Sequence, residues 1–150
     1  MSTAPDCKYC AQPPAHDMPL IATLRCADLF LLPDARHPGR CVLALHRHCT
    51  ELFQLSRAEQ AAWMHDLADA AQAIQAATGC DKINHAAYGD VFQHLHFHLV
   101  PKHAQGPQWG QPFELQPAAP TGLDIRGLCE ALRQALPTCA ATQAPPPAPQ

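Results

Sequence analysis

The first third of the chain consists of short apolar runs that alternate with polar residues and are broken by Pro, Asp and Gly. Side chains of a strand point alternately to its two faces, so such runs are typical of short strands that place one face in a core. A similar pattern returns after residue 80, on both sides of Gly89-Asp90. Five strands are therefore expected, at 19–25, 27–32, 40–46, 81–88 and 91–100.

The period of the apolar positions changes between the third and fourth expected strands. Ser56-Arg-Ala-Glu59 has the sequence of a capping box, and Gly79 supplies a stop signal. Apolar residues recur at helical spacing between these two points, which predicts a long helix over 56–78. A C-terminal helix is expected over 123–136. The fold class is then α+β, with a five-stranded antiparallel sheet, one long helix and a C-terminal helix.

Length and composition indicate one domain. The chain has 150 residues, of which 47% are hydrophobic and 15% are charged, which is typical of a protein with its own core. We expect this domain to span 1–136. The segment 137–150 is rich in Pro and is expected to be a mobile tail.

Charge and hydropathy exclude several classes of partner. The chain has 10 Lys and Arg against 13 Asp and Glu, giving a net charge of −3, and it has no basic run. Sequence-independent binding to nucleic acid is therefore not expected. The apolar runs are too short to span a bilayer, and the first residues lack the order of a secretory signal. These observations predict a cytoplasmic protein without nucleic-acid or membrane partners.

The segment from Gln93 to Lys102 places His94, His96 and His98 at every second position, with apolar residues between them. On a strand these three histidines share one face, at intervals of about 6.6 Å, while the apolar set faces the core. Such a face has two chemical uses. The imidazoles can bind one transition metal, or a neutral imidazole can act as a nucleophile near pH 7, for which a phosphorus centre is suited.

Cys7 and Cys10 form a Cys-x-x-Cys pair near the N-terminus, a spacing found in redox motifs and in zinc sites. A redox motif requires a helix that begins after the first cysteine, and the following Ala11-Gln-Pro-Pro-Ala15 is a poor helix. The remaining six cysteines have no shared spacing and are expected to be ordinary small, buried residues.

The histidine segment resembles the signature of the histidine-triad (HIT) superfamily, filled here by His94-Leu-His-Phe-His-Leu-Val100. Arg40-Cys-Val-Leu-Ala-Leu-His-Arg-His48 looks like the strand of that family that ends in a histidine before the helix. Lys82-Ile-Asn-His-Ala-Ala-Tyr-Gly89 is similar to a bacterial branch described as diadenosine polyphosphate hydrolase-like. The likeness covers residues 7–115, the expected core of a HIT-like domain.

This resemblance implies a nucleotide hydrolase or nucleotidyl transferase that acts at the α-phosphate of nucleoside phosphate derivatives, through a nucleotidyl-histidine intermediate. It also implies a homodimer joined through the long helix and an edge strand, and chemistry that requires no metal. Position by position, His96 would be the nucleophile, His98 would assist the leaving group, and His94 would orient the neighbouring ring or bind a metal. Asn84 and Gly89 would lie near the phosphate.

The resemblance also implies which residues contact the nucleotide base and which bind a metal. Residues 24–30 would pack the base and ribose, with Leu24 and Phe30 as the apolar contacts. The matching positions for the other two ligands of a Cys2His2 zinc site are His48 and His94, so a structural zinc bound by Cys7, Cys10, His48 and His94 is expected.

One departure from the family pattern leaves alternatives open. Val91 stands three residues before the first histidine of the signature, where many members carry Ser or Thr that donates to the phosphate. A weakly active nucleotide-binding adaptor is therefore one alternative, and a metal-dependent enzyme that uses all three histidines as ligands is another. Trp109, in the loop after the histidine strand, fits either a surface or interface aromatic or a residue that shapes specificity.

Overall fold

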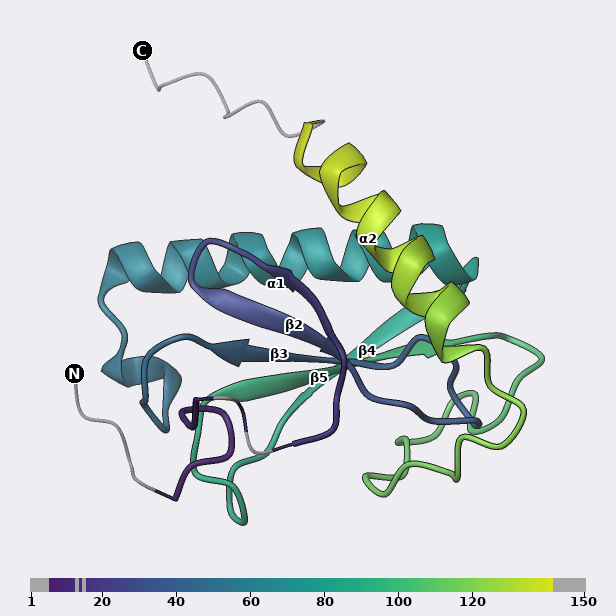
Figure 1. Ribbon diagram of the computed structural model, residues 1–150, viewed down its shortest axis with the longest axis horizontal. Coiled ribbons are helices and arrows are strands. Elements are labelled where there is room, and N and C mark those ends of the chain that lie inside the picture. The colour runs from purple at the N-terminus through teal and green to yellow at the C-terminus, as the bar shows by residue number, and fades with distance from the viewer. Residues whose placement is uncertain (1–5, 13, 15, 142–150) are drawn as a thin grey trace.

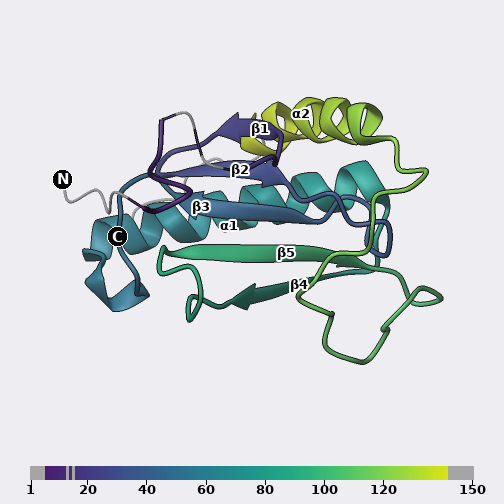
Figure 2. The same ribbon diagram turned by 60° about the horizontal axis from the view of Figure 1, so that its bottom comes forward.

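The computed structural model describes residues 6–12, 14 and 16–141. At its centre lies a five-stranded antiparallel sheet. Its strand order is β1-β2-β3-β5-β4, so β1 and β4 form its edges (Figure 2). The strands are β1 Leu20–Thr23, β2 Ala27–Leu31, β3 Cys41–Leu45, β4 Lys82–Ala87 and β5 His96–Lys102. The expectation of an α+β fold with this sheet and two helices is confirmed.

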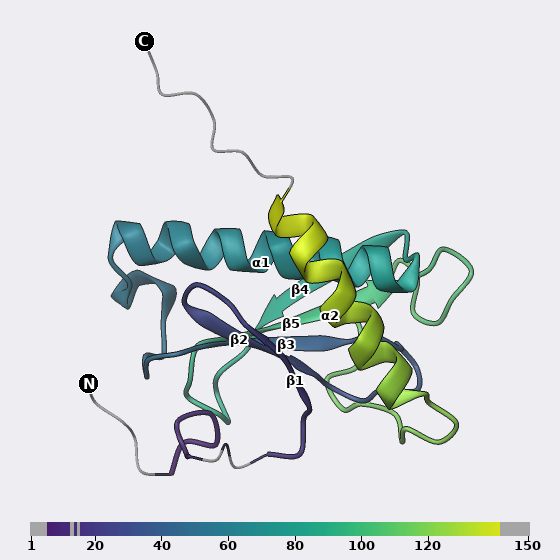
Figure 3. The ribbon, with the colours of Figure 1, turned by 45° about the horizontal axis from the view of Figure 1, so that its top comes forward.

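Both α-helices lie on the same face of the sheet and cross each other there (Figures 1 and 3). They are α1 Arg57–Thr78 and α2 Ile125–Ala141, and a short 3-10 helix, η1 Leu52–Gln54, precedes α1. No helix within the described ranges is both long and apolar enough to cross a bilayer. Among the described residues, only irregular segments lie over the opposite face, which we call the open face (Figure 2).

The helix α1 begins at the predicted capping box and ends at the predicted glycine. The Ser56 hydroxyl accepts a hydrogen bond from the Glu59 amide at 3.3 Å, and the Glu59 carboxylate accepts one from the Ser56 amide at 2.7 Å. Gly79 ends the helix in the left-handed conformation, at φ 67°, which a residue without a Cβ adopts at little cost. Since both signals lie in the sequence, this helix was predictable to within one residue.

Alternation along the central strands divides the core from the open face. Leu29, Leu43 and Leu99 are fully buried and pack toward the helices, where the Trp63 ring meets the Phe97 ring at 5.4 Å. On the other side of the sheet, Phe30, Val42 and His98 are paired in register across β2, β3 and β5. The open face therefore carries histidines beside apolar residues.

Two predicted boundaries were wrong by five residues. β5 begins at His96, not at residue 91, because the chain bends before it: the His94 amide bonds to the Phe92 carbonyl at 2.7 Å. His94 therefore lies before the strand, where simple alternation does not govern its side chain. The second error concerns α2, which continues to Ala141 instead of ending at 136. The remaining tail, 142–150, lies outside the described residues.

Candidate functional site

His96 stands at the first position of β5, and its ring is almost fully buried. Its Nδ1 lies 2.6 Å from the carbonyl oxygen of His94. Because a carbonyl oxygen can only accept a hydrogen bond, Nδ1 carries the proton and Nε2 keeps its lone pair. Burial lowers the pKa of His96, which favours the neutral ring. His96 is therefore held as a neutral imidazole with a free, nucleophilic Nε2.

His98 lies two residues further along the same face, with its ring centroid 5.4 Å from that of His96. Its Nδ1 is 3.4 Å from Nη2 of Arg40. A guanidinium can only donate, so Nδ1 of His98 accepts and Nε2 carries the proton. The two rings are thus in opposite tautomers: His96 offers an acceptor at Nε2 and His98 offers a donor.

The buried guanidinium of Arg40 keeps the His98 ring in its neutral protonation state. Arg40 is 0% exposed and forms an ion pair of 2.9 Å with Asp34, which is also 0% exposed. It further donates to the carbonyls of Glu114 and Leu115, at 3.1 and 2.9 Å. Burial, together with this neighbouring cation, lowers the pKa of His98 to about 3. His98 is consequently neutral throughout the physiological range.

Arg40 and Asp34 were not predicted as site residues from the sequence. A signal for them was present, because a charged residue directly before the all-apolar strand β3 must be buried with it and needs a partner. The sequence could not show that the partner would be an aspartate six residues earlier, nor that both would lie behind a histidine of β5.

Cys7, Cys10, His48 and His94 lie together, with one ligand atom of each within 4.8 Å of the others. Cys7 Sγ is 3.3 Å from His94 Nδ1, and Cys10 Sγ is 3.4 Å from His48 Nδ1. His94 donates from Nε2 to the Leu45 carbonyl at 2.8 Å, so its Nδ1 keeps a lone pair toward the sulfurs. Two thiols and two imidazoles in this arrangement are the donor set of a tetrahedral zinc site.

The segment that carries the two cysteines also brings an aromatic ring to the histidines. The ring of Tyr9 lies 5.1 Å from that of His94 and 5.2 Å from that of His96. Next to it, the ring of His16 meets Phe30 edge-on at 4.5 Å. Burial raises the pKa of Tyr9, so the phenol is neutral. Tyr9 was not singled out from the sequence, because nothing between the cysteines indicates which side chain faces the sheet.

Two pockets of the open face lie on either side of the histidines. One, of about 350 Å³, is lined by residues of β2 and β3 and of the N-terminal segment, among them Tyr9, Asp28 and Phe30. The other, of about 430 Å³, lies along β4 and includes Asn84, Tyr88 and Phe113. The rings of Tyr88 and Phe113 lie 6.1 and 6.3 Å from that of His98. The structure thus brings Phe30 and Asn84 to the face that carries His96 and His98.

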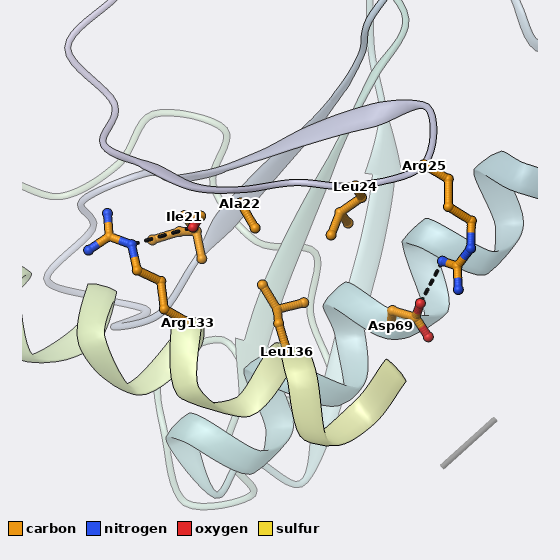
Figure 4. A pocket seen from close by; sticks show the side chains of 7 residues that line it. All are labelled: Ile21, Ala22, Leu24, Arg25, Asp69, Arg133 and Leu136. Atoms are coloured by element: carbon orange, nitrogen blue, oxygen red, sulfur yellow. Dashed lines mark hydrogen bonds and ion pairs between the residues drawn. The ribbon is translucent and has the colours of Figure 1, made fainter. Parts of the chain in front are cut away.

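The structure does not bring Leu24 to this face. It lines a separate cavity of about 520 Å³ under the β1–β2 turn, beside α1 and α2 (Figure 4). Arg25 pairs with Asp69 at 2.7 Å on one side of this cavity, and Arg133 donates to the Ile21 carbonyl at 3.4 Å on the other. Gly89 lies in the segment that follows β4 and leads to the histidines.

Comparison with known proteins points to one family. The family model for the HIT domain matches residues 21–105. A histidine triad protein from Bradyrhizobium japonicum is 27% identical, with a TM-score of 0.72 and coverage of 80% of this chain and 91% of that one. One from Sinorhizobium meliloti is 26% identical, with a TM-score of 0.73 and coverage of 84% and 95%.

A zinc-bound histidine triad family protein from Mycobacterium smegmatis shares the fold, with a TM-score of 0.67 at 21% identity and coverage of 92% and 98%. A search of curated proteins gives no significant match. The family match ends at residue 105 and begins at residue 21, so it includes the three histidines but neither Cys7, Cys10 nor Trp109.

Proposed function

Because this chain belongs to the HIT domain family, whose members are generally nucleotide hydrolases or transferases, we propose that it transfers a nucleotidyl group at the α-phosphate of a nucleoside phosphate derivative. His96 is the nucleophile in this proposal, and the acceptor is water or a second substrate. The observation that carries the proposal is the pair of opposite tautomers, in which His96 presents a lone pair and His98 a proton on the same face.

The nucleoside fits the pocket that adjoins β2 and β3. Phe30 and Tyr9 supply apolar rings for the base, and the Asp28 carboxylate can accept hydrogen bonds from ribose hydroxyls. Ala44 pairs directly with His96 across β3 and β5, so a nucleoside in this pocket places its α-phosphate near the histidines. Asn84 and Gly89 are proposed to contact the phosphate from the β4 side.

The chemistry takes two steps. The lone pair of His96 Nε2 attacks the α-phosphorus, and the bond from phosphorus to the leaving group breaks, with its electron pair passing to the leaving group. His98 donates from Nε2 to a phosphate oxygen, which stabilises the charge that develops there. The His96 ring is then cationic, and its Nδ1–H remains bonded to the His94 carbonyl. In hydrolysis, water attacks the phosphorus, the P–N bond breaks, and one proton passes to solvent.

We further propose that Cys7, Cys10, His48 and His94 hold a structural zinc. Held by these four residues, a zinc ion would fix the ring of His94 and, through that residue, the carbonyl that orients His96. His94 then takes no direct part in the transfer, and the chemistry of the reaction rests on His96 and His98. The metal-dependent alternative, with all three histidines as ligands, has no support from the structure, because His94 turns toward the sulfurs.

The weakly active adaptor remains the second candidate. Val91 is 77% exposed in the segment before β5 and offers no hydroxyl at a position where many relatives carry a donor. An adaptor of this kind would bind nucleotide at the open face without forming a covalent adduct. A homodimer through α1 and β4 is compatible with either function.

Substitution His96→Ala tests the transfer reaction. We expect turnover of a dinucleoside polyphosphate to be abolished and affinity for AMP to stay within about tenfold, because His96 acts mainly in the transition state. Rapid acid quench of the wild-type protein, followed by intact-mass analysis, should detect an adduct of one nucleotidyl group that the variant lacks.

His103→Ala, at an exposed position directly after β5, is the matched control and should retain both turnover and adduct. A His96→Ala variant that keeps more than a few per cent of the wild-type rate would contradict the assignment. Nucleotide binding by the wild-type protein without adduct or turnover would favour the adaptor.

A further inference from the structure

We propose that Lys8 contacts the α-phosphate of the bound nucleotide and supplies the positive charge that the two central histidines lack. The inference rests on the proposed transfer reaction and adds a phosphate-binding residue to it. Lys8 stands between the two cysteines of the N-terminal segment, whereas the family match begins only at residue 21. The contact is therefore a property of this chain that the family match does not cover.

The proposed reaction brings an anionic phosphate to two uncharged rings. His98 accepts a hydrogen bond at Nδ1 from Arg40 and is therefore neutral, and His96 attacks only as a neutral imidazole. Arg40 is a cation in contact with His98, but its charge is paired with Asp34 at 2.9 Å. An unpaired cation beside the histidines would stabilise the phosphate, because the two rings offer it no net charge.

The ammonium group of Lys8 lies close to the nucleophile. Its Nζ is 5.0 Å from the centroid of the Tyr9 ring, which lies 5.2 Å from the centroid of the His96 ring. Nζ also lies 3.7 Å from the centroid of the Phe92 ring, in the segment before β5. Burial is the main cause that lowers the pKa of His96 and of His98, and the positive charge of Lys8 adds to it at both rings. The ammonium group is thus near enough to act on a phosphate bound at the histidines.

The charge of Lys8 has no counter-ion among the described residues. No carboxylate of those residues lies within 4.0 Å of Nζ, not even that of the exposed Asp6, which lines the same pocket of about 250 Å³. Val91 and Phe92 line this pocket too, and their side chains carry no hydrogen-bonding group. An aromatic face attracts an ammonium group but does not neutralise it. A half-buried cation whose three N–H donors bond to no described residue is suited to an anionic oxygen.

The backbone on both sides of Lys8 is held in place. The Cys10 amide donates to the Cys7 carbonyl at 3.0 Å, which closes a turn around Lys8. Cys7 Sγ lies 3.3 Å from His94 Nδ1, and Cys10 Sγ lies 3.4 Å from His48 Nδ1. A long, flexible side chain keeps its charge at one place only where its backbone is fixed, and this turn meets that condition. The residues of the proposed zinc site therefore position Lys8 as well.

Binding of AMP and of adenosine tests this contact, because the two ligands differ only in the phosphate. Lys8→Met keeps a long apolar side chain beside Tyr9 and Phe92 and removes the charge. By isothermal titration we expect it to weaken AMP binding by about tenfold, the size of one charge-assisted hydrogen bond, and to leave adenosine binding unchanged. Lys8→Arg keeps the charge and should retain most of the affinity for AMP. Arg126→Met, which removes an exposed cation on α2, should change neither ligand.

The outcomes separate the two proposals. If Lys8→Met binds AMP as tightly as the wild type, loses adenosine to the same extent, or behaves like Lys8→Arg, the phosphate contact is overturned. The transfer reaction is not, because it is tested by the adduct on His96. If the wild type binds neither ligand and forms no adduct, both proposals fail. The melting temperature of each Lys8 variant should equal that of the wild type, since Lys8 is half-buried and makes no ion pair with a described residue.

Discussion

At the scale of single residues, the two central histidines owe their complementary states to different partners. His96 is set by a main-chain carbonyl, which no substitution of a side chain removes directly. His98 is set by the Arg40 guanidinium, which in turn depends on Asp34. The charged and titratable groups that bear on His98 are Arg40, His96 and, from the N-terminal segment, Lys8. Of these, only Arg40 contacts Nδ1, so His98 can be tested separately from His96.

Removal of the Arg40 guanidinium should change both the pKa and the tautomer of His98. In Asp34→Asn/Arg40→Met the buried ion pair is replaced as a unit, which avoids leaving one buried charge alone. Without a cation beside it, the imidazolium form of His98 is less disfavoured, so we expect its pKa to rise from about 3 toward the ordinary value. The neutral ring should also populate the other tautomer, in which Nε2 cannot donate, and kcat should fall by about tenfold.

Nitrogen-15 NMR of the imidazoles measures both effects, through the pKa of His98 and the protonation of its Nδ1. Arg126→Met, an exposed arginine on α2, is the control and should alter neither. A purely structural role for Arg40 predicts a lower melting temperature with an unchanged His98 tautomer, and that result would contradict the assignment.

At the scale of elements, local signals and long-range pairing were predictable to different degrees. The capping box at Ser56 and the stop at Gly79 are written in consecutive residues, so α1 was located almost exactly. Alternation located the five strands, but it extended β5 through His94, where the chain instead bends and pairs its backbone with the segment after β3. Strand patterns cannot show such a bend, because it depends on which distant backbone groups accept the hydrogen bonds.

The same limit applies to the site. Spacing and resemblance brought together Cys7, Cys10, His48 and His94, and the structure places their ligand atoms within 4.8 Å of one another. Tyr9 lies on the same segment but carries no motif, and its place over His96 follows only from how that segment crosses the sheet. Leu24 was chosen for its position in a range, and the turn between β1 and β2 places it with the helices.

The N-terminal segment should depend on metal for its attachment to the sheet. It has little regular structure, and its two cysteines contact His94 and His48, which belong to the segments before β5 and after β3. We expect protein purified without added metal to contain about one zinc per chain, by elemental analysis, and Cys7→Ser/Cys10→Ser to contain almost none. The melting temperature of the double variant should fall, because structural zinc contributes to the free energy of folding.

Cys26→Ser is the control for this prediction, since Cys26 lies on the turn before β2 and outside the cluster. It should keep the zinc content of the wild type. A chelator should lower the melting temperature of the wild type and of Cys26→Ser but not that of the double variant. A wild-type protein with far less than one zinc per chain would rule the site out.

At the scale of the whole molecule, the helices close one face of the sheet and leave the other for ligands. The cysteine and histidine cluster lies where β5 begins, and Lys102 and Trp109 line a pocket where β5 ends. The net charge of −3 does not reveal the two lysines of this pocket, Lys82 and Lys102, because they are few and local. His96 thus lies between the proposed metal site, before β5, and the pocket lined by Lys82 and Lys102, at the other end of the strand.

The outer surface of α1 and the free edge of β4 are the two parts of the fold at which the family resemblance implies contact with a second copy of the chain. β4 is an edge strand of six residues, and the exposed side of α1 carries the small residues Ala61 and Ala68, which permit close approach of another helix. We expect light scattering coupled to gel filtration to give twice the chain mass of 16.3 kDa. Ala68→Glu, which adds a charge at the centre of this surface, should shift the protein to the monomer, whereas Ala119→Glu, in an exposed loop before α2, should not. A wild-type monomer, or a dimer that Ala68→Glu leaves intact, would show that α1 is not the interface.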